Sequence, residues 1–92
     1  MADNVYVVGT AMTKIGKYLE KGIKVLTGEA LDLVLKDCGL ERSDIEAAWF
    51  SNSGWGYHSF QHSIRGQVAL SANALEGIPI INVENACASA ST

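Results

Sequence analysis

Hydrophobic residues along this chain fall into short runs that are separated by polar, glycine-containing segments. Residues 5–8 form a β-branched and aromatic run that stops at Gly9. Because this run does not alternate with polar residues, it predicts a strand that is buried on both faces. Residues 47–51 and 80–84 predict two more strands, and Pro79 precedes the last of them, at a position where a strand tolerates proline.

One segment between these strands has a clear helical period. Within residues 23–38, apolar side chains recur at positions 23, 26, 30, 34 and 38. Gly39 and then Leu40 follow, an order typical of a left-handed C-terminal cap with its hydrophobic contact. Gly28 lies inside the segment and disfavours a helix by about 1 kcal/mol relative to Ala. A helix that starts later, with Thr27 as its cap, is therefore an alternative.

The remaining elements are shorter. Ser43 and Glu46 have the spacing of a capping box, although only one turn fits before the next strand. Residues 63–75 predict a second helix that ends before Gly77. The order strand, helix, strand, helix, strand indicates an α/β fold with a parallel or mixed sheet. Three strands and two helices leave much apolar surface uncovered, which is typical of a piece of a larger α/β domain.

Composition narrows the functional classes. The chain has 92 residues, 48% of them hydrophobic and 18% charged, which suits one small domain. The net charge of −3, with dispersed Lys and Arg, argues against binding to nucleic acid or to an anionic membrane. No apolar run approaches the roughly 18 residues of a membrane helix. The N-terminus lacks the pattern of a signal peptide, so a cytoplasmic protein with free thiols is expected.

The motifs of common cofactor sites are missing or incomplete. Gly54 and Gly56 begin a GxGxxG pattern that fails at its last glycine, and no GxxxxGK[ST] motif exists. His58 and His62 have the spacing of a metal pair, but no third ligand lies nearby, so no metal site is expected. Among the nearby aromatic residues, Trp49 and Phe50 fit the core of the second strand. Three others predict a subunit interface or packing surface rather than a pocket: Trp55, Tyr57 and Phe60.

Cys87 is the candidate for covalent chemistry. It follows the last predicted strand after a two-residue turn and precedes small residues that are typical of a turn opening a helix. The free N–H groups at a helix N-terminus would stabilise a thiolate, and they would also hold the oxyanion formed when the sulfur attacks a carbonyl. A small buried cysteine without a catalytic role is the alternative. Cys38, which lies at a helix end beside Gly39, is expected to be a packing cysteine.

Residues 83–91, Val-Glu-Asn-Ala-Cys-Ala-Ser-Ala-Ser, resemble the nucleophile segment of the thiolase family. Residues 5–16 resemble the opening strand and loop of the same family, and residues 29–40 resemble its first helix. The likeness covers essentially the whole chain and is greatest for the branch related to sterol-carrier-protein thiolases and archaeal acetyl-CoA acetyltransferases. The cysteine segment is its most specific part.

The resemblance implies a fold and a chemistry. Residues 1–92 would form the β-α-β-α-β start of the N-terminal half of a thiolase and the beginning of its nucleophile helix. Cys87 would be acylated by a coenzyme A thioester, with its own backbone N–H as an oxyanion donor. That thioester is a substrate, and no bound cofactor is implied. A histidine and a second cysteine from the C-terminal half would move protons, and neither is in this chain. Ala90 stands where many thiolases have Gly, which puts the acyl-chain preference in doubt.

The resemblance also implies partners and leaves alternatives open. The partners are an acyl-CoA substrate, the remainder of a thiolase polypeptide and a second copy of the protein that contacts residues 80–84. Some relatives pair with a small zinc-containing OB-fold protein. A carbon–carbon lyase (retro-aldolase) or a ketoacyl synthase on the same scaffold is an alternative function. A non-catalytic, small α/β interaction module is another.

Overall fold

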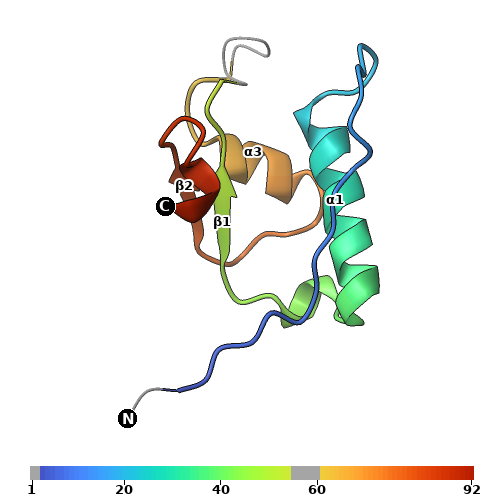
Figure 1. The fold of residues 1–92 in the computed structure, drawn as a ribbon, viewed down its shortest axis with the longest axis vertical. Coiled ribbons are helices and arrows are strands. Elements are labelled where there is room, and N and C mark those ends of the chain that lie inside the picture. Colours follow the sequence, from blue (N-terminus) through green and yellow to red (C-terminus); the bar gives the residue numbers. More distant parts are fainter. Residues whose placement is uncertain (1–2, 55–60) are drawn as a thin grey trace.

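The computed structural model describes residues 3–54 and 61–92, and it confirms the predicted α/β class (Figure 1). A small parallel sheet lies beside two helices. In chain order, the helices, strands and 3-10 turns are α1 (Ile23–Cys38), η1 (Arg42–Asp44), β1 (Ala48–Ser51), α3 (Arg65–Ser71), β2 (Ile80–Val83) and η2 (Ser89–Ser91). No helix in the described part of the chain has the length and hydrophobicity that a membrane crossing requires.

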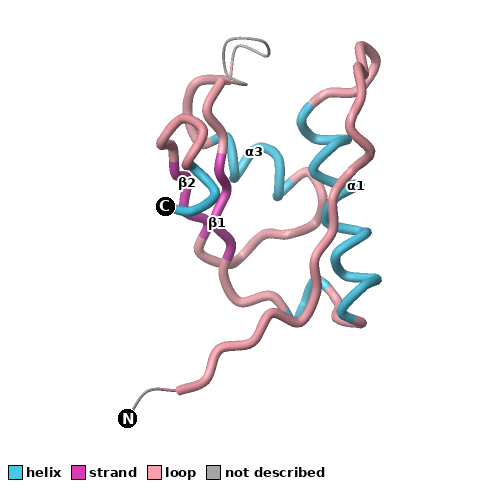
Figure 2. The backbone as a smooth tube through the Cα atoms, in the orientation of Figure 1, coloured by secondary structure: helices cyan, strands magenta, loops and turns pink. Residues whose placement is uncertain are grey.

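The sheet consists of β1 and β2, which run parallel in a register that pairs Ala48 with Ile80 and Ser51 with Val83. The connection between them carries α3, which lies beside the sheet (Figure 2). The backbone of α3 comes close to the strands at Gly66. A Cβ atom at Gly66 would lie 2.7 Å from Phe50 Cβ, which is closer than real Cβ atoms approach. The small residue therefore lets the helix approach the strands.

Two predictions about β1 need correction or refinement. The strand begins at Ala48 rather than at Ala47, and its side chains alternate between half-buried and exposed. Phe50 lies on the side of α3, as expected for a core residue. Trp49 was expected in the core as well, but it is 65% exposed. Successive side chains of a strand point to opposite faces, and only one face of this sheet is covered by α3.

The first helix has the bounds that its periodicity predicts, and Gly39 caps it in the left-handed conformation. Gly28 does not shift the start of the helix to Thr27, since α1 begins at Ile23. Instead, Gly28 is buried against Asn73, and a Cβ atom at this position would overlap the side-chain oxygen of Asn73. The glycine is therefore retained for packing despite its low helix propensity.

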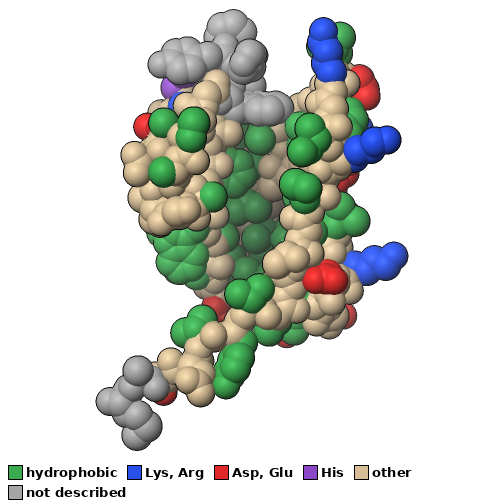
Figure 3. All heavy atoms as spheres, viewed as in Figure 1, with side chains coloured by type: hydrophobic (Ala, Val, Ile, Leu, Met, Phe, Trp, Pro, Cys, Tyr) green, Lys and Arg blue, Asp and Glu red, His purple; other side chains and the backbone are tan. Residues whose placement is uncertain are grey.

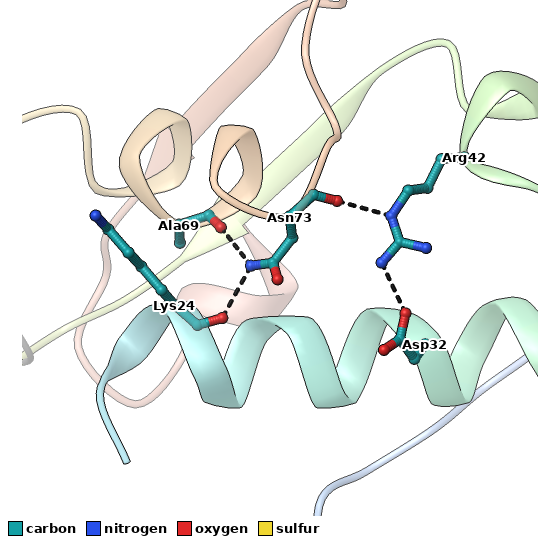
Figure 4. A network of polar contacts seen from close by, with 5 residues as sticks. All are labelled: Lys24, Asp32, Arg42, Ala69 and Asn73. Carbon is teal, nitrogen blue, oxygen red and sulfur yellow. Dashed lines mark hydrogen bonds and ion pairs between the residues drawn. The ribbon is translucent and has the colours of Figure 1, made fainter. Parts of the chain in front are cut away.

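A polar network joins α1 to η1 and to the segment that follows α3 (Figure 4). Asn73 Nδ2 donates hydrogen bonds to Lys24 O at 2.8 Å and to Ala69 O at 2.7 Å. Arg42 Nε donates to Asn73 O at 2.7 Å, and Arg42 Nη2 lies 2.7 Å from Asp32 Oδ1. Two helices and a turn are thus held together by side chains as well as by apolar contact.

The segment expected to be the first strand, residues 5–8, lies in a loop with side chains between 65% and 94% exposed. Figure 1 shows it running outward toward the N-terminus, away from the sheet, and the chain reaches α1 only after this segment. Gly9 packs against Cys38, and Thr10 N donates to Asp37 Oδ2 at 3.0 Å. These contacts fix the chain at the C-terminal end of α1, and residues 5–8, which precede them, stay away from the edge of β1. Among the described residues, the sheet therefore has two strands, and β2 has a neighbour on one side only.

The ends of the other elements differ from the prediction for local reasons. The helix expected over residues 63–75 ends at Ser71. Ala74 has a φ of 63°, and the chain turns there to bring Asn73 onto α1. The expected capping box at Ser43 is replaced by one that begins at Glu41, whose N–H donates to Asp44 Oδ2 at 2.9 Å.

The core is small. The buried hydrophobic residues of the described chain lie on α1, on α3 and just after α3: Leu35, Ala69, Leu70 and Leu75. Figure 3 shows apolar side chains along a hollow between the sheet and the side that carries α1 and the N-terminal segment. Much hydrophobic surface therefore remains in contact with solvent.

Candidate functional site

The nucleophile segment begins where β2 ends, at Val83, one residue earlier than predicted. The strand stops because the chain then turns on itself. Glu84 Oε2 accepts a hydrogen bond from Ala86 N at 2.5 Å, and Ala88 N donates to Asn85 O at 2.9 Å. Ala86 has a φ of 46°, in the left-handed region that non-glycine residues rarely adopt. Cys87 is thus preceded by a strained, tight turn.

The side chain of Cys87 is exposed and carries a free thiol. Within this chain, Cys87 is therefore not the small buried residue of the alternative interpretation. Of the five residues that follow Cys87 in this chain, Ser89–Ser91 form the single 3-10 turn η2, where the sequence predicts the beginning of a helix. Its hydrogen bonds run from Ser91 N to Ala88 O and from Thr92 N to Ser89 O. The expected stabilisation of a thiolate by the N–H groups of a helix N-terminus stays a prediction.

Ser89 stabilises the turn through hydrogen bonds to its backbone. Its Oγ accepts a hydrogen bond from Asn85 N at 2.8 Å and donates one to Ala86 O at 2.7 Å. Ser89 O in turn accepts a hydrogen bond from Ser51 Oγ at 3.1 Å. Residues 84–89, which we call the cysteine turn, are therefore bound to the end of β1 as well as joined to β2. Sequence reasoning missed this role of Ser89, because a hydroxyl that bridges backbone groups within a turn leaves no periodic signal.

A cavity of about 100 Å³ lies at the same edge of the sheet, at the carboxyl ends of the two strands. Ligands of α/β proteins commonly bind at this edge. Its lining residues come from β1, β2, α3 and the adjoining loops: Phe50, Asn52, His62, Ile64, Arg65, Asn82, Val83 and Glu84. Of these residues, His62 was considered from the sequence, as half of a possible metal pair. Arg65 and Asn82 were not predicted, because neither periodicity nor a motif marks them.

Arg65 and Asn82 are held in place beside this cavity. Arg65 Nε donates to Gln61 O at 3.0 Å. Asn82 Oδ1 accepts from Gly66 N at 2.6 Å, and Asn82 Nδ2 donates to Gln67 Oε1 at 2.7 Å. The cavity thus has both polar and apolar side chains in its wall. It shares Glu84 with the cysteine turn, although Cys87 itself is not among its lining residues.

The other candidates of the sequence analysis lie apart from this site or outside the described residues. Cys38 is half-buried on α1, where its Sγ lies 3.7 Å from Leu35 O, as expected for a packing cysteine. His58 and the aromatic residues predicted for an interface lie outside the described residues: Trp55, Tyr57 and Phe60. Residues 3–54 and 61–92 contain no group of three potential metal ligands.

The clearest electrostatic effect lies far from the cysteine turn. Lys21 Nζ lies 2.6 Å from Glu29 Oε1 and 4.7 Å from the centre of the Tyr18 ring. The hydrogen bond to Glu29 raises the pKa of Lys21 above its ordinary value. This pair fixes the loop before α1 and has no contact with the candidate site.

Known proteins resemble this chain over nearly its whole length, although no family model matches it. Non-specific lipid-transfer protein-like 2 of Caenorhabditis elegans is 41% identical over 91 residues, which are 96% of this chain and 21% of that protein. Sterol carrier protein 2 of Gallus gallus is 36% identical, over 100% of this chain and 16% of its own length.

An enzyme is among the relatives as well. Acetyl-CoA acetyltransferase of Methanothermobacter thermautotrophicus is 33% identical, over 94% of this chain and 22% of its own length. The chain thus spans about a fifth of the length of the relatives that it matches. The comparisons confirm the resemblance seen in the sequence, and the chain is a relative of the thiolase family.

Proposed function

We propose that this chain is the nucleophile-bearing, N-terminal part of a thiolase-type acyltransferase that acts on acyl-CoA thioesters, with Cys87 as the acylated residue. The observation that carries the proposal is the exposed thiol of Cys87 on a strained turn at the carboxyl edge of a parallel sheet. The acetyltransferase among the relatives supports the same reaction class.

In the thiolytic direction, the deprotonated sulfur of Cys87 attacks the 3-keto carbonyl carbon of a 3-ketoacyl-CoA. A C–S bond forms and the bond between carbons 2 and 3 breaks, so that the acyl group stays on Cys87. The leaving acetyl-CoA enolate takes up a proton and departs as acetyl-CoA. The sulfur of coenzyme A then attacks the acyl-cysteine. A bond between the acyl carbon and the coenzyme A sulfur forms, the bond to the Cys87 sulfur breaks, and the shortened acyl-CoA leaves while the proton of the coenzyme A thiol passes to Cys87. Claisen condensation is the reverse of this sequence.

The acid–base groups for these proton transfers are proposed to come from the rest of the polypeptide. Catalysis needs a general base within hydrogen-bond reach of the thiol. The resemblance places a histidine and a second cysteine in the C-terminal half of a thiolase. The relatives are about five times longer than this chain, which leaves room for such a half.

Selective alkylation tests the assignment of Cys87. The natural polypeptide that carries these residues is treated with iodoacetamide, and peptides containing Cys87 and Cys38 are followed by mass spectrometry. Cys87 should react first because it is exposed while Cys38 is half-buried, and a short acyl-CoA should protect Cys87 alone. Preferential labelling of Cys38, or equal labelling of Cys87 with and without acyl-CoA, would contradict the assignment of Cys87 as the acylated residue.

A second candidate function is the binding of an acyl or sterol chain without chemistry. Two of the relatives are named for lipid transfer or sterol carriage. A pocket of about 400 Å³ between α1 and α3 has the apolar side chains Ile23, Val25 and Val68 in its wall. Binding of a fluorescent fatty acid that is weakened by Val68→Glu and unaffected by Cys87→Ser would favour this function. No binding by the parent protein would exclude it.

A further inference from the structure

The hydroxyl of Ser89 lies at the centre of the cysteine turn. Ser89 is the one buried polar residue among those that the structure describes, with 6% of its surface exposed. Its Oγ both accepts from Asn85 N and donates to Ala86 O, so one atom joins the two residues that precede Cys87. A buried hydroxyl with both kinds of partner is difficult to replace, because either backbone group would lose its hydrogen bond.

The turn needs hydrogen bonds that stabilise it because its backbone is strained. Ala86 is an L-residue with a φ of 46°, a conformation that persists only when surrounding contacts hold it. Ser89 Oγ holds the carbonyl of Ala86, and Glu84 Oε2 holds its N–H. The Glu84 side chain is exposed, so water competes for its carboxylate, whereas the Ser89 contact is shielded from water.

A second contact fixes the turn relative to the sheet. Ser51 ends β1, and its Oγ donates to Ser89 O at 3.1 Å. Ser89 therefore connects the strained turn to a strand that is distant in sequence. Ser91 lies two residues later in the same 3-10 turn and is exposed, and its backbone N–H donates to Ala88 O.

We propose that Ser89 is a positioning residue that holds Ala86 in the left-handed conformation and thereby fixes where Cys87 presents its sulfur. This inference rests on the proposed function for its catalytic consequence, but the positioning itself concerns the turn alone. Loss of the hydroxyl releases Ala86 into an ordinary backbone conformation. The sulfur of Cys87 then moves relative to a bound thioester, while the thioester site itself is unchanged.

The experiment compares Ser89→Ala with the matched control Ser91→Ala in the natural polypeptide. Three quantities are measured: the rate of Cys87 acylation by acyl-CoA, KM for the thioester, and hydrogen exchange at the Asn85 amide. Displacing a reacting group by about 1 Å lowers the reaction rate roughly 100-fold. The acylation rate of Ser89→Ala is therefore expected to fall at least about tenfold. KM should stay unchanged and the Asn85 amide should exchange faster, while Ser91→Ala should match the parent.

Two further variants keep the test decisive. Ser89→Thr retains a hydroxyl and should restore most of the acylation rate and the protection of the Asn85 amide. If Ser89→Ala does not fold, Ser51→Ala removes only the bond from β1 to Ser89 O and should give a smaller effect in the same direction. The proposal is overturned if Ser89→Ala and Ser91→Ala have equal acylation rates and equal exchange at Asn85.

Failure of the positioning role and failure of the proposed function give different results. If the parent protein forms no acyl-Cys87, but Ser89→Ala still accelerates Asn85 exchange and changes the alkylation rate of Cys87, the proposed function fails and the positioning role stands. If the parent forms acyl-Cys87 and Ser89→Ala changes none of these quantities, the positioning role fails and the function stands.

Discussion

At Gly28, helix propensity and packing favour different residues. Its place inside α1 is unfavourable for a helix by about 1 kcal/mol relative to Ala. Its contact with Asn73 leaves no room for a Cβ atom. The hydrogen bonds that Asn73 makes to Lys24 O and Ala69 O depend on this close approach. The packing requirement therefore decides which residue stands here.

Gly28→Ala is expected to destabilise the protein, although propensity alone predicts the opposite. Displacing Asn73 should lose one or both of its side-chain hydrogen bonds, at about 1–3 kcal/mol for the groups left unpaired. Chemical denaturation measures the change. Gly54→Ala is the matched control, because a Cβ atom there has no neighbour within 4 Å, and its effect should stay within about 0.5 kcal/mol. A more stable Gly28→Ala protein would contradict the account.

A double variant separates crowding from propensity. Asn73→Ala alone should destabilise the protein, because Lys24 O and Ala69 O lose their donor. In Asn73→Ala, the obstacle to a Cβ atom at position 28 is gone, so adding Gly28→Ala should then be neutral or stabilising by up to about 1 kcal/mol. Strict additivity of the two changes in unfolding free energy would show that Asn73 is not what Gly28 accommodates.

The packing of α3 on the sheet is the corresponding constraint at the scale of elements. A Cβ atom at Gly66 would approach Phe50 Cβ to 2.7 Å and Ile80 Cγ2 to 2.9 Å, so both strands touch the helix at this point. The N–H of Gly66 also donates to Asn82 Oδ1. The contact thus sets the distance between α3 and the wall of the cavity at the strand ends.

Gly66→Ala should push α3 away from the sheet and lower the free energy of unfolding by about 1–3 kcal/mol, the usual range for overpacking. Near-ultraviolet circular dichroism and denaturant titration measure the two effects. Ala72→Gly, at the exposed end of α3, offers a control for general helix propensity, with a loss of about 1 kcal/mol or less. An unchanged stability of Gly66→Ala would show that the helix does not need this approach.

Elements with local signals were predictable, and those that depend on distant partners were not. The period of α1 and its Gly39 cap specified that helix to the residue, and the apolar runs located β1 and β2 to within one residue. Residues 5–8 have the composition of a strand, but a strand also needs a partner edge, and Gly9 and Thr10 bind α1 instead. The role of Ser89 depends on a turn whose conformation no pattern encodes.

The whole molecule exposes more surface than a compact protein of its mass. Its accessible surface is 6914 Å² for 9.8 kDa. The scaling for compact monomers gives roughly 5,200 Å². The excess includes the apolar residues 5–8 and three further side chains of the N-terminal loop: Met12, Ile15 and Leu19. Such a surface is typical of a chain that packs against further polypeptide.

Residues 1–92 expressed alone should therefore lack a cooperative transition. With only four buried hydrophobic side chains in the described chain, apolar burial is too small to offset the conformational entropy of folding. Thermal circular dichroism should give a broad change, and a hydrophobic dye should bind at room temperature. A sharp transition with a monomeric mass would contradict this expectation and favour the small-module alternative.

The identity of the acylated residue tests the central claim most directly. The natural polypeptide is incubated briefly with acetyl-CoA, quenched in acid, digested and analysed by mass spectrometry. The account predicts an acetyl group on the peptide that contains Cys87, its loss in Cys87→Ser, and its retention in Cys38→Ser. An acetyl group that persists in Cys87→Ser, or one carried by another residue of the parent protein, would contradict the account.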